Sequence, residues 1–425
     1  MGKTLKILII AVGGLIALLI IAVVLVTVFV NPNDYKGTIA QAVEQKTGRK
    51  LVFEGNIGLS VFPWVGLELG PLSLSNAKGF KEQPFAKIKG ADIRVKIIPL
   101  LYRKLEMAKV SLDGLTLNLE RHADGKTNWE DLTGPETAKK EEKKAGPEKE
   151  EMPLEMFTVG GVEIKNSNVT WDDQKDKVYY AMQNINLNVG SIEPDKPIDF
   201  SLGFNMTSKE PAMEVTPHLK GVAKLDLEKK IYEIDGMKLN TTVRGDTIPG
   251  KEVKSTLGAN IRADLGKQTL DVADLNLDAF GVMAKGGLKA DHILDKAAFS
   301  GNLTVSPFNP RELFKQLGQE PPATADKKAL EKASAAIVFS GTTDSFDLKE
   351  LTAQLDETNI KGNATVKDLK NPSSTFTFAV DKIDLDRYLP PPSEKKEGEV
   401  AKPSGESPAA TKPNFEPLRK LRPHN

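Results

Sequence analysis

Apolar and polar residues alternate with a period of two over most of this chain. Side chains of a β-strand point to opposite faces in turn, so this period is typical of strands that bury one face. The clearest segments are residues 51–61, 91–97, 115–119, 185–189 and 376–378. Because each such strand has one apolar face, the sequence predicts a mostly β protein in which these faces are folded inward.

Residues 7–30 form an uninterrupted apolar run in which Thr27 is the only polar side chain. A bilayer core about 30 Å thick needs roughly 20 helical residues to cross it, so the run is long enough. The alternative is a cleavable signal peptide, which has an apolar core of about 7–15 residues and a small-residue cleavage site. The end of this run has no such site, and we predict a single-pass membrane anchor. Lys3 and Lys6 before the run favour a cytoplasmic N-terminus.

Composition excludes several classes of site. The chain has 425 residues, with 58 Lys and Arg against 58 Asp and Glu, so its net charge gives no sign of a nucleic-acid partner. It has no cysteine, which excludes structural disulfides and thiolate metal sites.

The chain divides into five predicted segments. These are the cytoplasmic tip and transmembrane anchor (1–30), a β domain (31–132), a charged linker or loop (133–153), a repeat-like β-rich domain (154–389), and a disordered Pro-rich linker with a tail (390–425). The two linkers are rich in Pro, Glu and Lys and cannot bury enough apolar surface to offset chain entropy. Residues 277–314 and 355–389 share a pattern of strands followed by a short helix, which predicts strand groups added serially.

Few helices are predicted between the strands. An amphipathic helix is expected over residues 34–47, where Gly48 suits the position after the last turn. Three shorter helices are expected over residues 310–317, 326–335 and 384–389.

No catalytic motif is present in the sequence. Gly125-Lys126-Thr127 resembles the end of a phosphate-binding loop, but Glu120 stands where the first glycine belongs, and a turn is favoured. The four histidines, His122, His218, His292 and His424, are far apart in sequence. Asp381, Asp384 and Asp386 could hold a cation, although a solvated strand end before a helix is the favoured interpretation. We therefore predict no enzyme activity, metal or cofactor.

The alternating apolar positions are the remaining candidates for function. They could form an ordinary sandwich core, or they could line a curved sheet whose open apolar groove holds acyl chains.

Residues 31–132 resemble the N-terminal domain of the AsmA family. The resemblance rests on Asn31-Pro32-Asn33-Asp34-Tyr35, Thr47-Gly48-Arg49, Phe62-Pro63-Trp64 and the stretch from Gly125 to Trp129, which occur in the family's order. It implies a bacterial inner-membrane protein with a periplasmic β-rich body that acts in outer-membrane biogenesis. The family is also similar to bridge-like lipid transfer proteins, in which a long β groove carries phospholipid. Members usually continue into a further strand-rich domain, so a truncated or frameshifted product is expected here.

The resemblance and the strand pattern together give two functional expectations. The first is phospholipid transport or presentation along an elongated, curved β-sheet groove, with phospholipid acyl chains and the inner membrane as partners. The second is a non-transporting assembly or regulatory factor for outer-membrane protein targeting, with envelope proteins as partners. The candidate lipid-facing residues are Ile93, Val95, Ile97, Leu115, Leu117 and Leu119.

Overall fold

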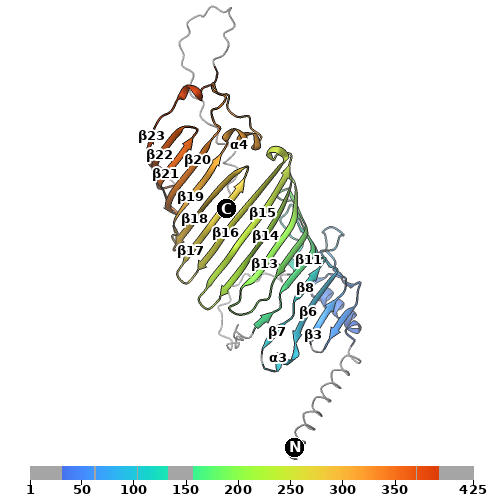
Figure 1. Ribbon diagram of the computed structural model, residues 1–425. Coiled ribbons are helices and arrows are strands. Elements are labelled where there is room, and N and C mark those ends of the chain that lie inside the picture. The colour runs from blue at the N-terminus through green and yellow to red at the C-terminus, as the bar shows by residue number, and fades with distance from the viewer. Residues whose placement is uncertain (1–30, 62–63, 103, 133–156, 370, 392–425) are drawn as a thin grey trace, which may run out of the picture.

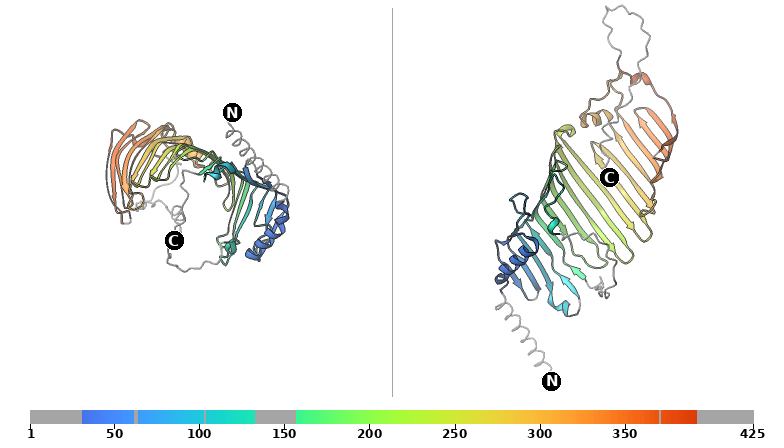
Figure 2. Two further views of the ribbon diagram at one scale, coloured as in Figure 1. Left: turned by 90° about the horizontal axis from the view of Figure 1, so that it is seen from below. Right: turned by 180° about the vertical axis from the view of Figure 1, so that it is seen from behind.

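The computed structural model describes residues 31–61, 64–102, 104–132, 157–369 and 371–391. They form one 23-stranded sheet that is elongated, curved and unclosed (Figures 1 and 2). The prediction of a mostly β fold with a long curved sheet and few short helices is confirmed. The predicted anchor (1–30), the predicted linker (133–153) and most of the predicted tail lie outside the described residues. Among the helices that are described, none is long and apolar enough to cross a membrane.

The N-terminal part of the sheet consists of long strands that are each interrupted once. The halves are β1 (Leu51–Phe53) with β2 (Ile57–Ser60), β3 (Trp64–Leu69) with β4 (Leu72–Leu74), β5 (Ala86–Ile88) with β6 (Gly90–Lys96), and β8 (Val110–Asp113) with β9 (Thr116–Arg121). Gly70-Pro71 separates β3 from β4, because proline cannot donate a ladder hydrogen bond. Gly114 separates β8 from β9 with a φ of 62°, which glycine adopts without steric cost.

A parallel crossing joins this part to the rest of the sheet. Strand β11 (Val162–Asp173) runs parallel to β8 and β9 in a single register. The short β10 (Phe157–Val159) likewise runs parallel to β7 (Leu105–Met107).

From β11 to β23 every sequential pair of strands is antiparallel. The strands are β12 (Val178–Val189), β13 (Ile198–Lys209), β14 (Ala212–Asp226), β15 (Ile231–Gly245), β16 (Glu252–Asp264), β17 (Thr269–Ala279), β18 (Val282–Asp291), β19 (Ala298–Phe308), β20 (Ala333–Thr342), β21 (Ser345–Leu355), β22 (Thr358–Lys367) and β23 (Ser373–Val380). The sheet is therefore a long meander whose strands are added in chain order.

The first edge of the sheet is covered by helical structure. The 3-10 helix η1 (Pro32–Tyr35) leads into α2 (Lys36–Thr47), and Gly48 ends α2 in the left-handed conformation, as predicted. The Asn33 side chain donates to the Ile57 carbonyl at 3.0 Å and accepts from the Ile57 N–H at 2.9 Å. The Asn33 amide thus makes the pair of hydrogen bonds that the backbone of a neighbouring strand would make. It fixes the point where the chain enters the described body.

The other helical predictions have mixed outcomes. Helix α4 (Pro310–Gln316) and the 3-10 helix η5 (Leu385–Arg387) lie where short helices were expected. The predicted helix over 326–335 is wrong, because residues 326–332 form turns and β20 begins at Ala333. Three successive N–H groups of that turn, those of Leu330, Glu331 and Lys332, donate to the Asp356 carboxylate. This side chain holds the segment in a conformation that helix propensity alone did not indicate.

A line of β-bulges follows the long axis of the sheet. Asn166 in β11, Asn184 in β12, Gly236 in β15 and Asp274 in β17 have φ values of 50°, 53°, 57° and 52°, and each lies at a shift of strand register. A bulge bends its strand and increases the local twist. Repeated in several strands, these bulges account for much of the curvature seen in Figure 2.

Asparagine side chains satisfy the backbone at these bulges. Asn260 accepts from the Gly236 N–H at 2.7 Å and donates to the Asp274 carboxylate at 2.8 Å. Asn276 and Asn186 each donate to the carbonyl of the bulge residue two positions earlier. The bulges are thus specified by polar side chains rather than tolerated as irregularities.

Candidate functional site

One face of the sheet carries a row of apolar residues that runs across nearly its whole length. Each residue of the row is the register partner of the next, and the row takes one residue from each strand that it crosses. Its members are Ile57, Leu69, Ala91, Leu112, Ile164, Leu187, Leu202, Leu219, Leu239, Leu257, Leu277, Ala284, Val305, Ala335, Ala353, Ile360 and Val380. At about 4.8 Å for each strand step, this row extends on the order of 75 Å.

Further rows on the same face are equally apolar. One consists of Leu51, Leu74, Ala86, Leu117, Val169, Met182, Met206, Val215, Val243 and Val253. Another consists of Ile198, Ala223, Ile234, Ile261, Val272, Leu288, Gly301, Phe339, Leu348, Ala364 and Phe376. Side by side, the rows make this face a continuous apolar surface.

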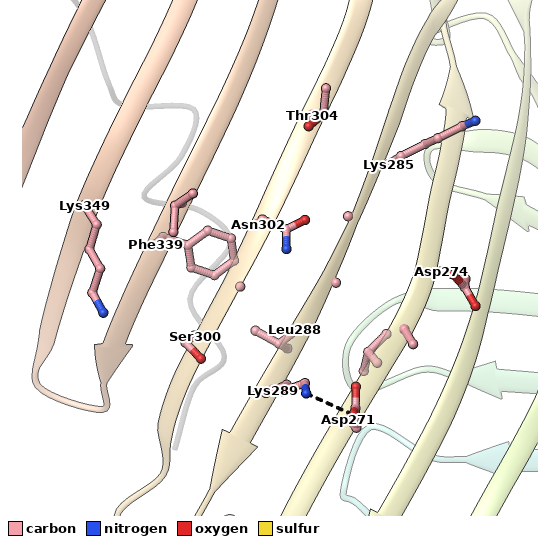
Figure 3. Close-up of a pocket in the computed structure, with 16 residues that line it drawn as sticks. Asp271, Asp274, Lys285, Leu288, Lys289, Ser300, Asn302, Thr304, Phe339 and Lys349 are labelled. Carbon is pink, nitrogen blue, oxygen red and sulfur yellow. Dashed lines mark ion pairs between the residues drawn. The ribbon is translucent and has the colours of Figure 1, made fainter.

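The opposite face is polar. The row that alternates with the leucines includes Asn188, Ser201, Lys220, Lys238, Asn276, Lys285 and Thr304. Figure 3 looks onto this face, where Lys285, Ser300, Asn302 and Thr304 surround a shallow hollow over Gly286, Gly287 and Gly301. Lys289 and Asp271 form an ion pair at 3.7 Å there. The lining mixes these polar groups with apolar residues such as Val338 and Phe339, and it has no cluster of groups suited to catalysis among the residues that line it.

The apolar face is the concave one. Side chains converge on the inner side of a curved sheet and cover one another, whereas they diverge on the outer side. Leu202 is half-buried and its neighbour Ser201 is exposed, and the same contrast holds for Leu187 and Asn188. Figure 2 shows the sheet curving about its long axis with this inner side open. The concave face therefore offers apolar surface along the sheet.

The structure brings most of the predicted lipid-facing residues together on this face. Ile93 pairs with Leu67, Val95 with Val65, Leu117 with Val169 and Leu119 with Trp171. Leu115 lies in the interruption between β8 and β9, one residue before β9 begins at Thr116. Whether these residues contact lipid stays a prediction.

Ile97 departs from the predicted strand. Strand β6 ends at Lys96, and Ile97 begins the short helix α3 (Ile97–Leu101). Pro99 explains the change, because proline is tolerated in the first turn of a helix but removes a ladder hydrogen bond from a strand.

Two of the sequence motifs meet in a buried polar cluster at the N-terminal end. Arg49, 1% exposed, donates from Nη2 to the Asn128 carbonyl at 2.6 Å and from Nε to Asp131 at 2.8 Å. The fully buried Asn128 side chain donates to Asn76 and to the Asn118 carbonyl. The hydrogen bond from Arg49 lowers the pKa of Asp131. This cluster fixes the loop after β9.

The other sequence candidates for chemistry are held in structural contacts. Gly125 lies in the expected turn, closed by a hydrogen bond from its N–H to the His122 carbonyl. The Asp381 carboxylate accepts from the backbone and side chain of Asn359 at 2.8 and 2.7 Å. Within the described residues, no group of three or more metal-ligating side chains is found.

The last strand leaves apolar side chains uncovered at the far edge. Phe376, Phe378 and Val380 of β23 are 66%, 49% and 48% exposed. Strand β23 pairs with β22, and no second partner strand is found for it among the described residues. The sheet is covered by α2 at its first edge and open at its last.

Sequence reasoning found the alternation but not the rows. It chose candidates between residues 93 and 119, whereas the longest uniform stretch of the central row is Leu187, Leu202, Leu219, Leu239, Leu257 and Leu277. The sequence feature that could have located this row is the leucine that recurs near the middle of successive alternating segments.

Comparison with known proteins places the sequence in one family. The family model of the AsmA family matches residues 1–419. Protein AsmA of Escherichia coli (strain K12) is 30% identical over 112 residues, which cover 26% of this chain and 16% of that protein. No solved structure matches the chain. The match over nearly all of the sequence shows that this chain belongs to the AsmA family.

Proposed function

We propose that this protein is a non-catalytic carrier that moves or presents phospholipid along the concave face of its sheet. The observation that carries the proposal is the uninterrupted apolar row from Ile57 to Val380. Family membership and the large curved sheet fit cell-envelope biogenesis or lipid transport in general. We further propose that residues 7–30 anchor the chain in the bacterial inner membrane, with the described body in the periplasm.

The energetics explain why such a row is needed. Exposing acyl chains to water costs about 0.8 kcal/mol per CH₂, so a two-chain phospholipid costs on the order of 20 kcal/mol. A carrier lowers this barrier only if apolar surface continues along the path. The concave face provides that continuity, while the polar outer face keeps the same strands compatible with water. No reacting group is required.

Two neighbouring residues of β13 provide a sharp test. Leu202 belongs to the apolar row, and Ser201 belongs to the outer face. The test uses the full chain and a photocrosslinkable phospholipid. We expect Leu202→Asp to reduce crosslinking at least fivefold, because it places a charge among the lipid chains. We expect Ser201→Asp, the matched control, to leave crosslinking unchanged.

Circular dichroism establishes that both variants are folded. Equal crosslinking by the two folded variants would show that lipid does not lie on the concave face.

A second candidate function is an assembly factor for outer-membrane proteins. The open, apolar edge of β23 favours it, because an exposed strand edge can pair with a strand of another protein. Full-length protein that purifies with a stoichiometric protein partner and without phospholipid supports this alternative over the carrier.

A further inference from the structure

Two large side chains at helix α3 are exposed to solvent. Ile98 is 56% exposed, and Tyr102, just after the helix, is 72% exposed. Figure 1 places α3 at the lower tip of the sheet, at its N-terminal end, where β6 and β7 are joined. More than half of each side chain is therefore left uncovered by the described body.

Aromatic and basic groups lie beside α3. Trp64, at the start of β3, is the register partner of Lys96, the last residue before α3. The Lys96 ammonium lies 5.1 Å from the centre of the Trp64 ring and 2.9 Å from the Glu106 carboxylate. Trp, Tyr and Lys side chains have an apolar body and a polar tip, a combination that favours the boundary between lipid headgroups and acyl chains.

The entry point of the chain lies in the same group of N-terminal strands as this surface. Asn33 is fixed to Ile57 of β2, and β2 pairs with β3, which pairs with β6. Two strand steps, about 10 Å, separate β2 from β6, and α3 begins six residues, about 20 Å, along β6 from Ala91, which lies level with Ile57. The apolar run of the sequence ends at Val30, directly before this entry point. A membrane that holds residues 7–30 is within reach of α3.

We propose that Trp64, Lys96, Ile98 and Tyr102, here called the membrane rim, dock into the interface of the bilayer that holds the N-terminal segment. The proposal rests on the anchored carrier proposed above. It adds the surface through which that carrier contacts the membrane. Docking at this rim brings the first strands of the concave face to the lipid surface, so acyl chains can enter without crossing water.

The absence of cysteine allows single-cysteine labelling of the full chain. Ile98→Cys and Tyr102→Cys carry an environment-sensitive dye. Leu294→Cys is the matched control, because Leu294 is 66% exposed in the turn between β18 and β19, far from the rim. The protein is reconstituted in vesicles of phosphatidylethanolamine and phosphatidylglycerol that include brominated lipid. We expect brominated lipid to quench dye at positions 98 and 102 at least threefold more than at position 294.

Equal quenching at the three positions would overturn the proposal. Dye at positions 98 and 102 that is shielded from water but not quenched by brominated lipid would overturn it as well, because that result indicates a protein contact. The outcome is separable from that of the carrier proposal. Equal lipid crosslinking by the Leu202→Asp and Ser201→Asp variants, with quenching at the rim intact, would reject the carrier and retain membrane docking.

Discussion

At the scale of single residues, the fully buried Asn128 is held by three side-chain hydrogen bonds. Its amide donates to the Asn76 side chain at 2.9 Å and to the Asn118 carbonyl at 2.8 Å, and its side-chain oxygen accepts from the Glu120 N–H at 2.9 Å. Aspartate cannot replace it, since a carboxylate lacks both donors and would lie beside the buried Glu120. The polar contacts of one side chain thus tie together three segments of the N-terminal domain.

We predict that Asn128→Ala lowers the free energy of unfolding by about 2–3 kcal/mol, because it leaves buried backbone groups without partners. Asn302→Ala, at an exposed position of the outer face, is the control and should change it by less than about 0.5 kcal/mol. Tryptophan fluorescence during urea titration reports on this region directly, since the rings of Trp129 and Trp171 lie 5.4 Å apart beside the cluster. Superimposable unfolding curves of the two variants would contradict the assigned role of Asn128.

At the scale of the element, strands were predictable and their interruptions were not. A period of two identifies a strand from its own sequence, and the breaks at Gly70-Pro71 and Gly114 follow from the distinct backbone limits of glycine and proline. The bulges at Asn166 and Asn184 had no such signal. They depend on asparagine side chains from neighbouring strands, which become neighbours only once the sheet has formed. The predicted helix over 326–335 failed for the same reason, since Asp356 lies outside that segment.

We predict that glycine and valine at position 184 have clearly different effects on the free energy of unfolding. Asn184→Gly should leave the free energy of unfolding within about 0.5 kcal/mol of the parent, because glycine adopts a φ of 53° freely. Asn184→Val should lower it by about 1–2 kcal/mol more, because a β-branched residue is strained in the left-handed region. Urea midpoints followed by circular dichroism measure both. A valine variant as stable as the glycine variant would show that β12 shifts register there at no cost.

At the scale of the whole molecule, the functional surface is a property of strand register. The alternation within one segment fixes which residues share a side, but a one-residue slip against its neighbour would reverse that side. The row that contains Leu202, Leu219 and Leu239 exists because successive strands keep their apolar sides aligned despite the bulges. Sequence reasoning could therefore predict a curved apolar sheet, and could name residues near Val95 and Leu117, without locating the continuous row.

If the apolar row is a continuous path, lipid must pass the central strands before it reaches the far ones. A set of independent binding sites would not show this dependence. Phe200 in β13 and Phe346 in β21 lie on the concave face on either side of β15 and β16. A photoreactive phenylalanine analogue at either position reports lipid there. In full chain reconstituted in vesicles, we predict that Leu239→Asp with Leu257→Asp leaves lipid crosslinking at Phe200 intact. The same pair should reduce crosslinking at Phe346 at least fivefold, because lipid enters from the membrane end and meets a polar barrier.

The matched control places the same charges on the outer face of the same strands, as Lys238→Asp with Thr256→Asp. It should leave crosslinking unchanged at both reporters, since neither side chain faces the path. Equal loss at Phe200 and Phe346 in the inner-face variant would indicate general unfolding. Unchanged crosslinking at Phe346 in that variant, with the fold intact, would mean that lipid reaches the far strands directly from solvent or another partner. In that case the concave face would be a storage surface rather than a path.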